Sequence, residues 1–311
     1  MLARTAASLY WMGRYVERAD FTARLIEATV RLDALSSRPA GAAAWTSALT
    51  VIEALAAYET LGQPKLQRHV APFLAISTDH RGSMLNCIED ARRNARAVRT
   101  ALSREAWSAI NHAWLRFSNR DDTHDIHSLL ALVDSVQADM LAFTGALERM
   151  LHHPSSMFIH LGAAIERADN TARLMDVKYH ILLPEGEAVG GAIDRDQWTT
   201  LLQTVSAVNA YRLLYRGGLN ASDVVEFLTL RAELPRSLIA CTAEVVHQLN
   251  AIAEVTGNFA TADSLAMTRL STLKRTQVRQ IISGGLHEYL EDFLQQNAKL
   301  DEAIRFQFRF N

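Results

Sequence analysis

The sequence predicts an all-α protein, and three observations support this prediction. Glycine and proline are scarce, with 14 and 6 among 311 residues, so little interrupts long segments rich in Ala, Leu, Arg and Glu. The apolar residues of these segments recur with helical spacing instead of alternating along a strand. Asn-Gly and Asp-Gly, the dipeptides that mark a tight hairpin between two strands, do not occur.

The first predicted element is a long helix near the N-terminus. Its apolar residues follow a period of about 3.6, as expected for a helix with one face against a core. These residues are Met12, Tyr15, Val16, Ala19, Ala23, Ile26 and Val30. A similar stretch holds Met140, Leu141 and Leu147 and ends before His152, His153 and Pro154. The segments 36–44 and 184–191 are rich in small residues, Gly and Pro, and we expect both to be linkers.

Two segments of the chain are nearly identical. Residues 17–25 read Glu-Arg-Ala-Asp-Phe-Thr-Ala-Arg-Leu, and residues 166–174 differ from them only in having Asn170 where the first has Phe21. Gly13 and Gly162 precede the two segments by the same distance. Further matches follow in the same order: Trp45 with Trp198, Tyr58 with Tyr211, Phe73 with Phe227, Ser83 with Ser237, and Cys87 with Cys241.

These matches predict a tandem duplication whose boundary lies near residues 153–156. Residues 1–153 would form a first helical repeat and residues 154–311 a second. We expect two pseudo-symmetric bundles of antiparallel helices, packed either as separate domains or as one compact domain.

Composition restricts the class of protein. An apolar share of 49% is typical of a globular core, and a net charge of -2 gives no sign of nucleic-acid binding. Two cysteines are too few for a disulfide scaffold, which favours a reducing compartment. No uncharged apolar run reaches the ~18 residues of a membrane span, and the nearest candidate is residues 237–255. We therefore expect a soluble, cytoplasmic protein that does not enter a membrane.

The first Glu-Arg helix gathers its charges on one face. At about 100° per residue, this face holds Gly13, Glu17, Asp20 and Arg24, with Arg14 and Arg18 beside it. The second helix repeats the pattern with Gly162, Glu166, Asp169 and Arg173, and with Arg167 beside them. Asp20 and Arg24 have the i,i+4 spacing at which a carboxylate meets a guanidinium.

Three interpretations of this face are open. A charged helix face is most often solvated and carries weak ion pairs. However, the two segments kept this face while much of the flanking sequence diverged, which favours a more demanding role. Either the carboxylates and arginines form a buried polar network, or Arg18 and Arg167 with Glu17 and Glu166 line a cleft that grips a zwitterionic or phosphorylated ligand.

Other chemistry is weakly indicated. Residues 119–127 gather Asp121, Asp122, His124, Asp125 and His127, which are types that bind metal, but the spacing is not that of a helix-fixed site. We expect a solvated loop there and no metal. Cys87 and Cys241 lie in apolar stretches and are predicted to be buried thiols. The sequence has no phosphate-binding loop and no dinucleotide motif, so we expect no cofactor.

Two further elements carry candidate residues. Pro235 and Ser237 are typical of a helix start, where Arg236 would need an acidic partner; we expect that partner to be Glu17, Glu166 or a ligand. The final segment, residues 305–310, alternates cations and aromatic residues. It could pack its phenylalanines on the core or serve as a docking tail for a partner protein.

Three separate motifs resemble one family. Residues 11–20 read Trp-Met-Gly-Arg-Tyr-Val-Glu-Arg-Ala-Asp, residues 161–169 read Leu-Gly-Ala-Ala-Ile-Glu-Arg-Ala-Asp, and residues 234–237 read Leu-Pro-Arg-Ser. Together they resemble the bacterial Alpha-E family, an α-helical domain with a Glu-Arg motif, and the resemblance runs across essentially the whole chain. Ala163 departs from it, because a basic residue matching Arg14 is expected there.

The resemblance implies a context for function. Members of the family are encoded beside, or fused to, circularly permuted ATP-grasp proteins, often with a transglutaminase-like protease nearby. It therefore implies an accessory protein that partners an ATP-grasp ligase in peptide or amide-bond metabolism. The alternative is an enzyme for amide transfer or hydrolysis, with Glu17 or Glu166 as general base and Arg18 or Arg167 as a carboxylate or phosphate clamp. The sequence does not decide between them, nor does it give the oligomeric state.

Overall fold

A computed structural model of the chain describes residues 1–35, 38–119, 125–180 and 191–310. All regular secondary structure within these residues is helical, which confirms the predicted all-α fold.

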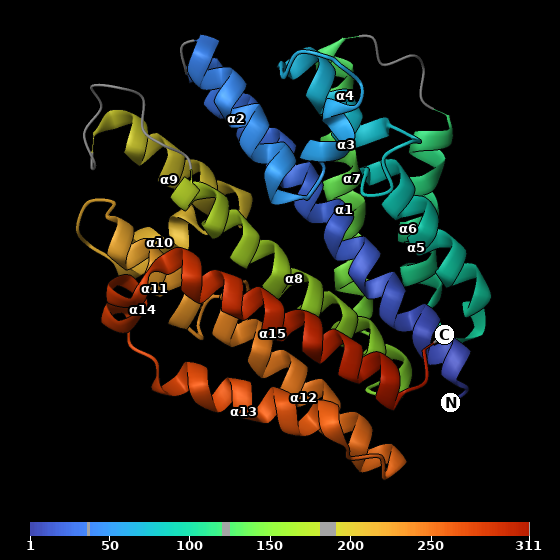
Figure 1. Ribbon diagram of the computed structural model, residues 1–311. Helices are drawn as coiled ribbons and strands as arrows, with labels where there is room; N and C mark the ends of the chain where they lie inside the picture. The colour runs from blue at the N-terminus through green and yellow to red at the C-terminus, as the bar shows by residue number, and fades with distance from the viewer. Residues whose placement is uncertain (36–37, 120–124, 181–190, 311) are drawn as a thin grey trace.

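The helices follow one another with short connections (Figure 1). Their bounds are α1 Ala3–Leu35, α2 Arg38–Val51, α3 Leu55–Glu59, α4 Gln67–Ile76, α5 Met84–Ala97, η1 Arg99–Ala101, α6 Arg104–Ser118, α7 Ile126–Leu147, α8 Pro154–His180, α9 Ala192–Thr204, α10 Val208–Leu214, α11 Ala221–Leu230, α12 Leu238–Thr256, α13 Thr261–Arg275, α14 Val278–Gly284 and α15 Leu286–Gln307.

Two long helices, α1 and α8, lie side by side at the centre of the molecule (Figure 1). On one side α1 packs against α2, α4, α5 and α7, and on the other α8 packs against α12 and α15. The connecting helix α9 contacts both central helices. The two chain ends lie near each other at one end of this pair (Figure 1).

The central position of α1 explains why its sequence is apolar on one face and charged on the other. Met12, Ala19 and Ile26 on the predicted apolar face are fully buried against the first group of helices. The opposite, charged face is covered as well, because α8 packs there. A helix enclosed in this way must satisfy its charges within the protein.

The contact between α1 and α8 is close because each helix places a glycine at the crossing. A Cβ built on Gly13 would lie 2.1 Å from the carbonyl oxygen of Ile159, and one built on Gly162 would lie 2.1 Å from that of Tyr10. The two glycines thus make reciprocal backbone contacts at matching places in the two similar segments. A methyl group at either position would force the helices apart.

One predicted linker is partly wrong. Ser36 and Ser37, and residues 184–190 of the second linker, lie outside the described residues. From Arg38 onward, however, residues 38–44 belong to α2. Proline is tolerated in the first turn of a helix, where its missing N–H would be unpaired in any case, and the alanines that follow are strong helix formers.

The helix nearest to a membrane span is also not the one expected. In the described part of the chain, α7 alone is long and apolar enough to cross a bilayer by length and composition, whereas residues 237–255 are not. Met140 and Leu147 of α7 are buried in the core, but Leu141 is exposed, contrary to its assignment to the apolar face. One face of α7 lies in the core, and α6 packs beside it.

The buried apolar side chains of both predicted repeats belong to one hydrophobic cluster. Matching residues also have matching roles: Ser83 and Ser237 cap α5 and α12, and Cys87 and Cys241 are both buried. Their positions are consistent with two related segments in one compact body. The duplication itself, and the boundary at residues 153 and 154, stay predictions.

The first testable consequence concerns the helix crossing. We expect Gly13→Ala or Gly162→Ala to lower the free energy of unfolding by about 1–3 kcal/mol, because the added methyl overlaps a backbone carbonyl that cannot move without separating α1 from α8. Urea denaturation followed by circular dichroism measures this.

Gly145→Ala is the matched control. Gly145 lies within α7 with open space around its Cα, so the same change there should be neutral or stabilise the helix by up to about 1 kcal/mol. Equal effects at Gly13 and Gly145 would contradict the proposed importance of the crossing.

Candidate functional site

Glu166 of α8 is held by two arginines of α1. Arg18 donates to it from Nε at 2.6 Å and from Nη2 at 3.0 Å, so that both carboxylate oxygens are engaged. Arg14 adds a third hydrogen bond from Nε to Oε2 at 2.8 Å. The glutamate is only 2% exposed, and this fork-to-fork geometry is the one that best satisfies a buried carboxylate.

Glu17 of α1 is held in the reciprocal way, but its arginines come from two elements. Arg167 of α8 donates to Oε2 from Nη2 at 2.8 Å and from Nε at 3.1 Å. Arg236, which lies before α12, donates to Oε1. Glu17 is 5% exposed, so this pair is also removed from water.

Arg236 takes the place of the basic residue that the second segment lacks at Ala163. In the first segment the extra arginine for the partner glutamate is Arg14, and its counterpart in the second is Ala163. Arg236 supplies that second guanidinium from the residue before Ser237, whereas Gly82 precedes the matching Ser83. Each glutamate therefore has two arginines, obtained from different places in the sequence.

The acidic residues at the next turn extend the network outward. Asp20 accepts from Arg24 at 2.9 Å and from Arg236 at 2.9 Å, and Asp169 accepts from Arg173 at 2.7 Å. The pairing of Asp20 with Arg24 and of Asp169 with Arg173 has the i,i+4 spacing read from the sequence.

Arg24 and Arg173 then reach across to the opposite segment. Arg24 donates to Ser206 Oγ, and Arg173 pairs with Glu53 at 2.8 Å. Ser206 and Glu53 both have a φ of 56°, a left-handed conformation that costs energy for residues other than glycine. Ser206 follows Trp198 by eight residues, and Glu53 follows Trp45 by eight residues, so the two turns occupy matching positions in the two halves. Each turn is bound by the arginine of the other half.

A third helix ties into the network through Arg14. Its Nη1 donates to Asp301 of α15 at 2.8 Å, and the buried Tyr10 hydroxyl donates to the same carboxylate oxygen. Sequence analysis missed Tyr10 and Asp301, along with Glu53 and Ser206. All four lack a motif of their own, and nothing in their local sequence marks them as partners of an arginine far along the chain.

The arginines control the protonation of the two glutamates. Burial by itself raises the pKa of Glu17, but the nearby Arg167 and Arg236 guanidiniums outweigh it and hold the pKa at about 2, below the usual 4.5. Burial likewise raises the pKa of Glu166, and Arg18 and Arg14 bring it below its usual value. Both groups are therefore carboxylates at neutral pH.

This geometry favours the buried network over the other two interpretations. The solvated-face interpretation is wrong for Glu17 and Glu166, which are sealed between α1 and α8. The cleft interpretation has less support, because the oxygens that would face a ligand are occupied by guanidiniums. Among the arginines of the network, Arg18 has the most exposed side chain, at 33%.

Ser237 was predicted to belong to the ligand site or polar network, but in the structure it caps a helix. Its hydroxyl caps α12 by accepting from the backbone N–H of Ala240, and it donates to the carbonyl of Arg231. These two hydrogen bonds fix Ser237 at the start of α12, and they thereby hold the adjacent Arg236 in position.

The other candidate chemistry has little support in the described residues. Asp121, Asp122 and His124 lie outside them, and Asp125 caps α7 through the backbone N–H groups of His127 and Ser128. Within the described ranges, no group of three His, Cys, Asp or Glu residues is placed to hold a metal. Burial raises the pKa of the Cys87 and Cys241 thiols to about 12, which leaves them protonated and unreactive.

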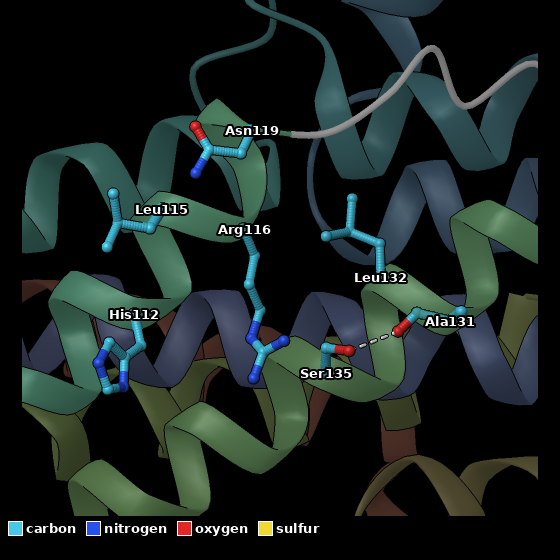
Figure 2. A pocket seen from close by; sticks show the side chains of 7 residues that line it. All are labelled: His112, Leu115, Arg116, Asn119, Ala131, Leu132 and Ser135. Carbon is cyan, nitrogen blue, oxygen red and sulfur yellow. Dashed lines mark hydrogen bonds between the residues drawn. The ribbon is translucent and has the colours of Figure 1, made fainter.

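A broad surface hollow of about 620 Å³ lies away from the network, between α6 and α7. Figure 2 shows Arg116 extending from α6 toward α7, with His112 and Leu115 on one side and Leu132 and Ser135 on the other. Arg116 is already paired with Asp139 at 2.8 Å. The described residues that line this hollow include no set of groups arranged for catalysis.

Acid should weaken the network in a defined pH range. Because the folded pKa of Glu17 is about 2 and its unfolded value is 4.5, its contribution is complete above the unfolded value and is lost as the pH falls toward the folded one. We expect a loss of about 3 kcal/mol from this residue between about pH 5 and pH 2, measured by urea unfolding at a series of pH values.

Removing one carboxylate should be more damaging than this. Glu17→Gln leaves Arg167 without its acidic partner and Glu166→Gln does the same to Arg18, while Arg236 keeps Asp20 and Arg14 keeps Asp301. Breaking an enclosed ion pair in this way typically costs about 3–5 kcal/mol. Glu53→Gln is the control, because this glutamate pairs with Arg173 at the surface and the change should stay within about 0.5 kcal/mol. A Glu17→Gln protein that unfolds like the Glu53→Gln protein would show that the network is not structural.

The chain is similar to longer proteins of mycobacteria. It is 27% identical, over 256 residues, to the uncharacterized protein Mb2597 of Mycobacterium bovis and to the uncharacterized proteins MT2643 and Rv2567 of Mycobacterium tuberculosis. Each alignment covers 76% of this chain but only 28% of the relative, so the chain spans less than a third of these relatives' length. No solved structure is significantly similar to it.

The family comparison covers nearly the whole chain. Residues 1–308 match the model of a family described as a predicted alpha-helical domain with a conserved ER motif. The Glu-Arg pairs at 17–18 and 166–167 are the ones that cross-link α1 and α8. This protein belongs to the Alpha-E family.

Proposed function

We propose that this protein is a non-catalytic, cytoplasmic helical partner of an ATP-grasp ligase in bacterial peptide or amide-bond metabolism. The observation that carries this proposal is the use of the Glu-Arg motif within the protein itself. The oxygens of both glutamates are bound by arginines of the protein itself, those of Glu166 by Arg14 and Arg18 and those of Glu17 by Arg167 and Arg236, so the motif builds a rigid body instead of an open reaction site.

The protonation of the glutamates supports the same proposal. A general base works best when its pKa lies near the working pH. The pKa of Glu17 is about 2, and arginines also lower that of Glu166, so neither carboxylate is suited to take a proton at neutral pH.

The greater length of the mycobacterial relatives supports the proposal that this protein works as part of a larger assembly. Because the matched region is 28% of each mycobacterial relative, those proteins contain extensive further sequence in the same chain. A domain that is joined to other regions in one protein commonly meets an equivalent region as a separate partner in another. The Alpha-E resemblance gives the ATP-grasp ligase as the candidate, and a transglutaminase-like protease as a second one.

The C-terminal segment is the surface that best fits such a partner. Phe308 packs edge-on against Phe158 with ring centres 4.9 Å apart, and Phe310 lies 5.3 Å from the Tyr10 ring. These two rings anchor the tail on the core, whereas Phe306 is 88% exposed. The tail therefore combines the two roles open from the sequence: it packs on the core and it offers a free aromatic side chain.

Charge defines the kind of partner surface that would fit. Phe306 borders an open groove of about 1070 Å³, and among the described side chains that line it Lys299, Arg305 and Arg309 are cationic whereas Glu302 alone is acidic. An acidic surface of the ligase with an apolar side chain to cover Phe306 would match both features.

The test is co-purification with the circularly permuted ATP-grasp protein of the same genome, in the presence of ATP and Mg²⁺. Phe306→Ala should reduce the retained ligase at least tenfold, as expected for an exposed aromatic anchor worth about 2 kcal/mol, without changing the unfolding temperature. Leu213→Ala is the control, since Leu213 is 79% exposed on α10 and outside the groove. A wild-type protein that never retains the ligase would overturn the proposal.

The alternative is an enzyme for amide transfer or hydrolysis that uses the Glu-Arg motifs, and partial exposure of Arg18 is the observation that favours it. Any turnover of amide substrates by the purified chain should then disappear in Arg18→Lys, because lysine keeps the charge but not the planar fork. Loss of turnover in this variant at unchanged stability would support the enzyme and count against the accessory role.

A further inference from the structure

A cluster of arginines lies on α5, η1 and α6, apart from the Glu-Arg network; α5 and α6 pack against each other (Figure 1). Residues 91–104 contain five arginines and no Asp or Glu, whereas the whole chain has a net charge of -2. Arg92 and Arg96 lie one turn apart on α5, and Arg99 follows in η1. Arg96 and Arg99 are exposed, and Arg92 is half-buried. This part of the surface is therefore basic although the protein as a whole is not.

Two tryptophans of α6 hold the arginines in place. The Arg92 guanidinium lies over the Trp114 ring, 3.7 Å from its centre, and Arg92 Nε donates to Asn111 Oδ1 at 2.9 Å. The Arg99 guanidinium lies 5.4 Å from the centre of the Trp107 ring. A guanidinium stacked on an indole is already ordered, so it loses less side-chain freedom when it binds an anion. The Arg-Trp face is the name used below for Arg92, Arg96, Arg99, Trp107 and Trp114.

The guanidiniums of this face are not neutralised within the protein. An arginine has five N–H groups, and Arg92 uses only its Nε, so both of its Nη groups are without a hydrogen-bond partner in the described part of the chain. Arg96 has no hydrogen bond or ion pair there. Arg99 has only a long contact of 3.4 Å from Nη1 to the carbonyl of Leu102. The face therefore presents free N–H donors and an uncompensated positive charge.

The packing of the helices does not require these arginines. Helix α12 is the counterpart of α5, as the match of Cys87 with Cys241 indicates, and it packs on α8 as α5 packs on α1. Counted from the two cysteines, the places of Arg92, Arg96 and Arg99 are taken in the second half by Val246, Asn250 and Ala253. The arginines are thus a feature of the first half alone, which favours a role in binding over a role in folding.

We propose that the Arg-Trp face binds an acidic peptide, with the carboxylates of its side chains on Arg92, Arg96 and Arg99. The Nη groups of a guanidinium form a planar fork that matches the two oxygens of a carboxylate. Arg92 and Arg96 are separated by about 6 Å along α5, and alternate residues of an extended peptide by about 7 Å. Acidic residues at alternate positions of such a peptide would therefore meet successive arginines.

The aromatic rings argue against a single-stranded nucleic acid in the same place. Bases bind such strands to proteins by stacking on a free aromatic face. Here arginines lie over Trp114 and Trp107, and the rings also pack against the hydrophobic core. The proposal does not depend on the ligase partnership, because it concerns a different surface from the groove at Phe306 and a direct contact with the peptide.

The experiment titrates the full-length protein into a fluorescently labelled pentaglutamate peptide with blocked ends and follows the anisotropy. We expect pentaglutamate to bind at least about tenfold more tightly than pentaglutamine, and a rise from about 50 to about 300 mM NaCl to weaken binding severalfold. No saturable binding of pentaglutamate, or equal binding of pentaglutamine, would overturn the proposal. A labelled single-stranded oligonucleotide that binds more tightly than pentaglutamate would overturn the assignment to a peptide.

A pair of matched double variants tests the location of the site. Arg96→Gln with Arg99→Gln should weaken pentaglutamate binding at least about tenfold, because two of the three forks are lost. Arg212→Gln with Arg279→Gln is the control, since it removes two exposed charges from α10 and α14 and should leave the affinity nearly unchanged. All four positions are exposed, and equal unfolding temperatures would verify that both proteins are folded. Equal losses of affinity in the two double variants would show that only the net charge matters and would overturn the site.

Discussion

The structure depends on the close crossing of α1 and α8 at Gly13 and Gly162. Because neither residue has a side chain, the helix backbones come close enough to bring Glu17 and Glu166 within reach of arginines on the facing helix. The approach and the ion pairs require each other. Without the glycines the guanidinium forks would not meet the carboxylates, and without the arginines two buried carboxylates would be intolerable in the core.

The cost of burying charge explains why the motif is a pair of residues and not a glutamate alone. Removing carboxylates and guanidiniums from water is expensive, and the attraction between them offsets this only with good geometry and full hydrogen bonding. Two arginines to each glutamate meet that condition. The same requirement explains Arg236: once the second segment has Ala163 in place of a basic residue, another element has to supply a guanidinium for Glu17.

A rigid centre of this kind leaves function to the periphery. The network fixes α1 against α8 and, through Asp301 and Arg236, orients α15 and the start of α12. The C-terminal segment with Phe306 is a surface feature that the network leaves unused.

Residue types and their spacing are enough to predict the helical class, the similarity of residues 17–25 to 166–174, the burial of the cysteines and the grouping of charges on one helix face. These follow from local periodicity and side-chain chemistry, which a linear pattern contains. The packing of the helices was needed to show that the charged face is enclosed, that Arg236 pairs with Glu17 rather than Glu166, and that Tyr10 and Asp301 join the network. These contacts link positions far apart in the chain, and their partners depend on how the helices pack, which no local pattern specifies.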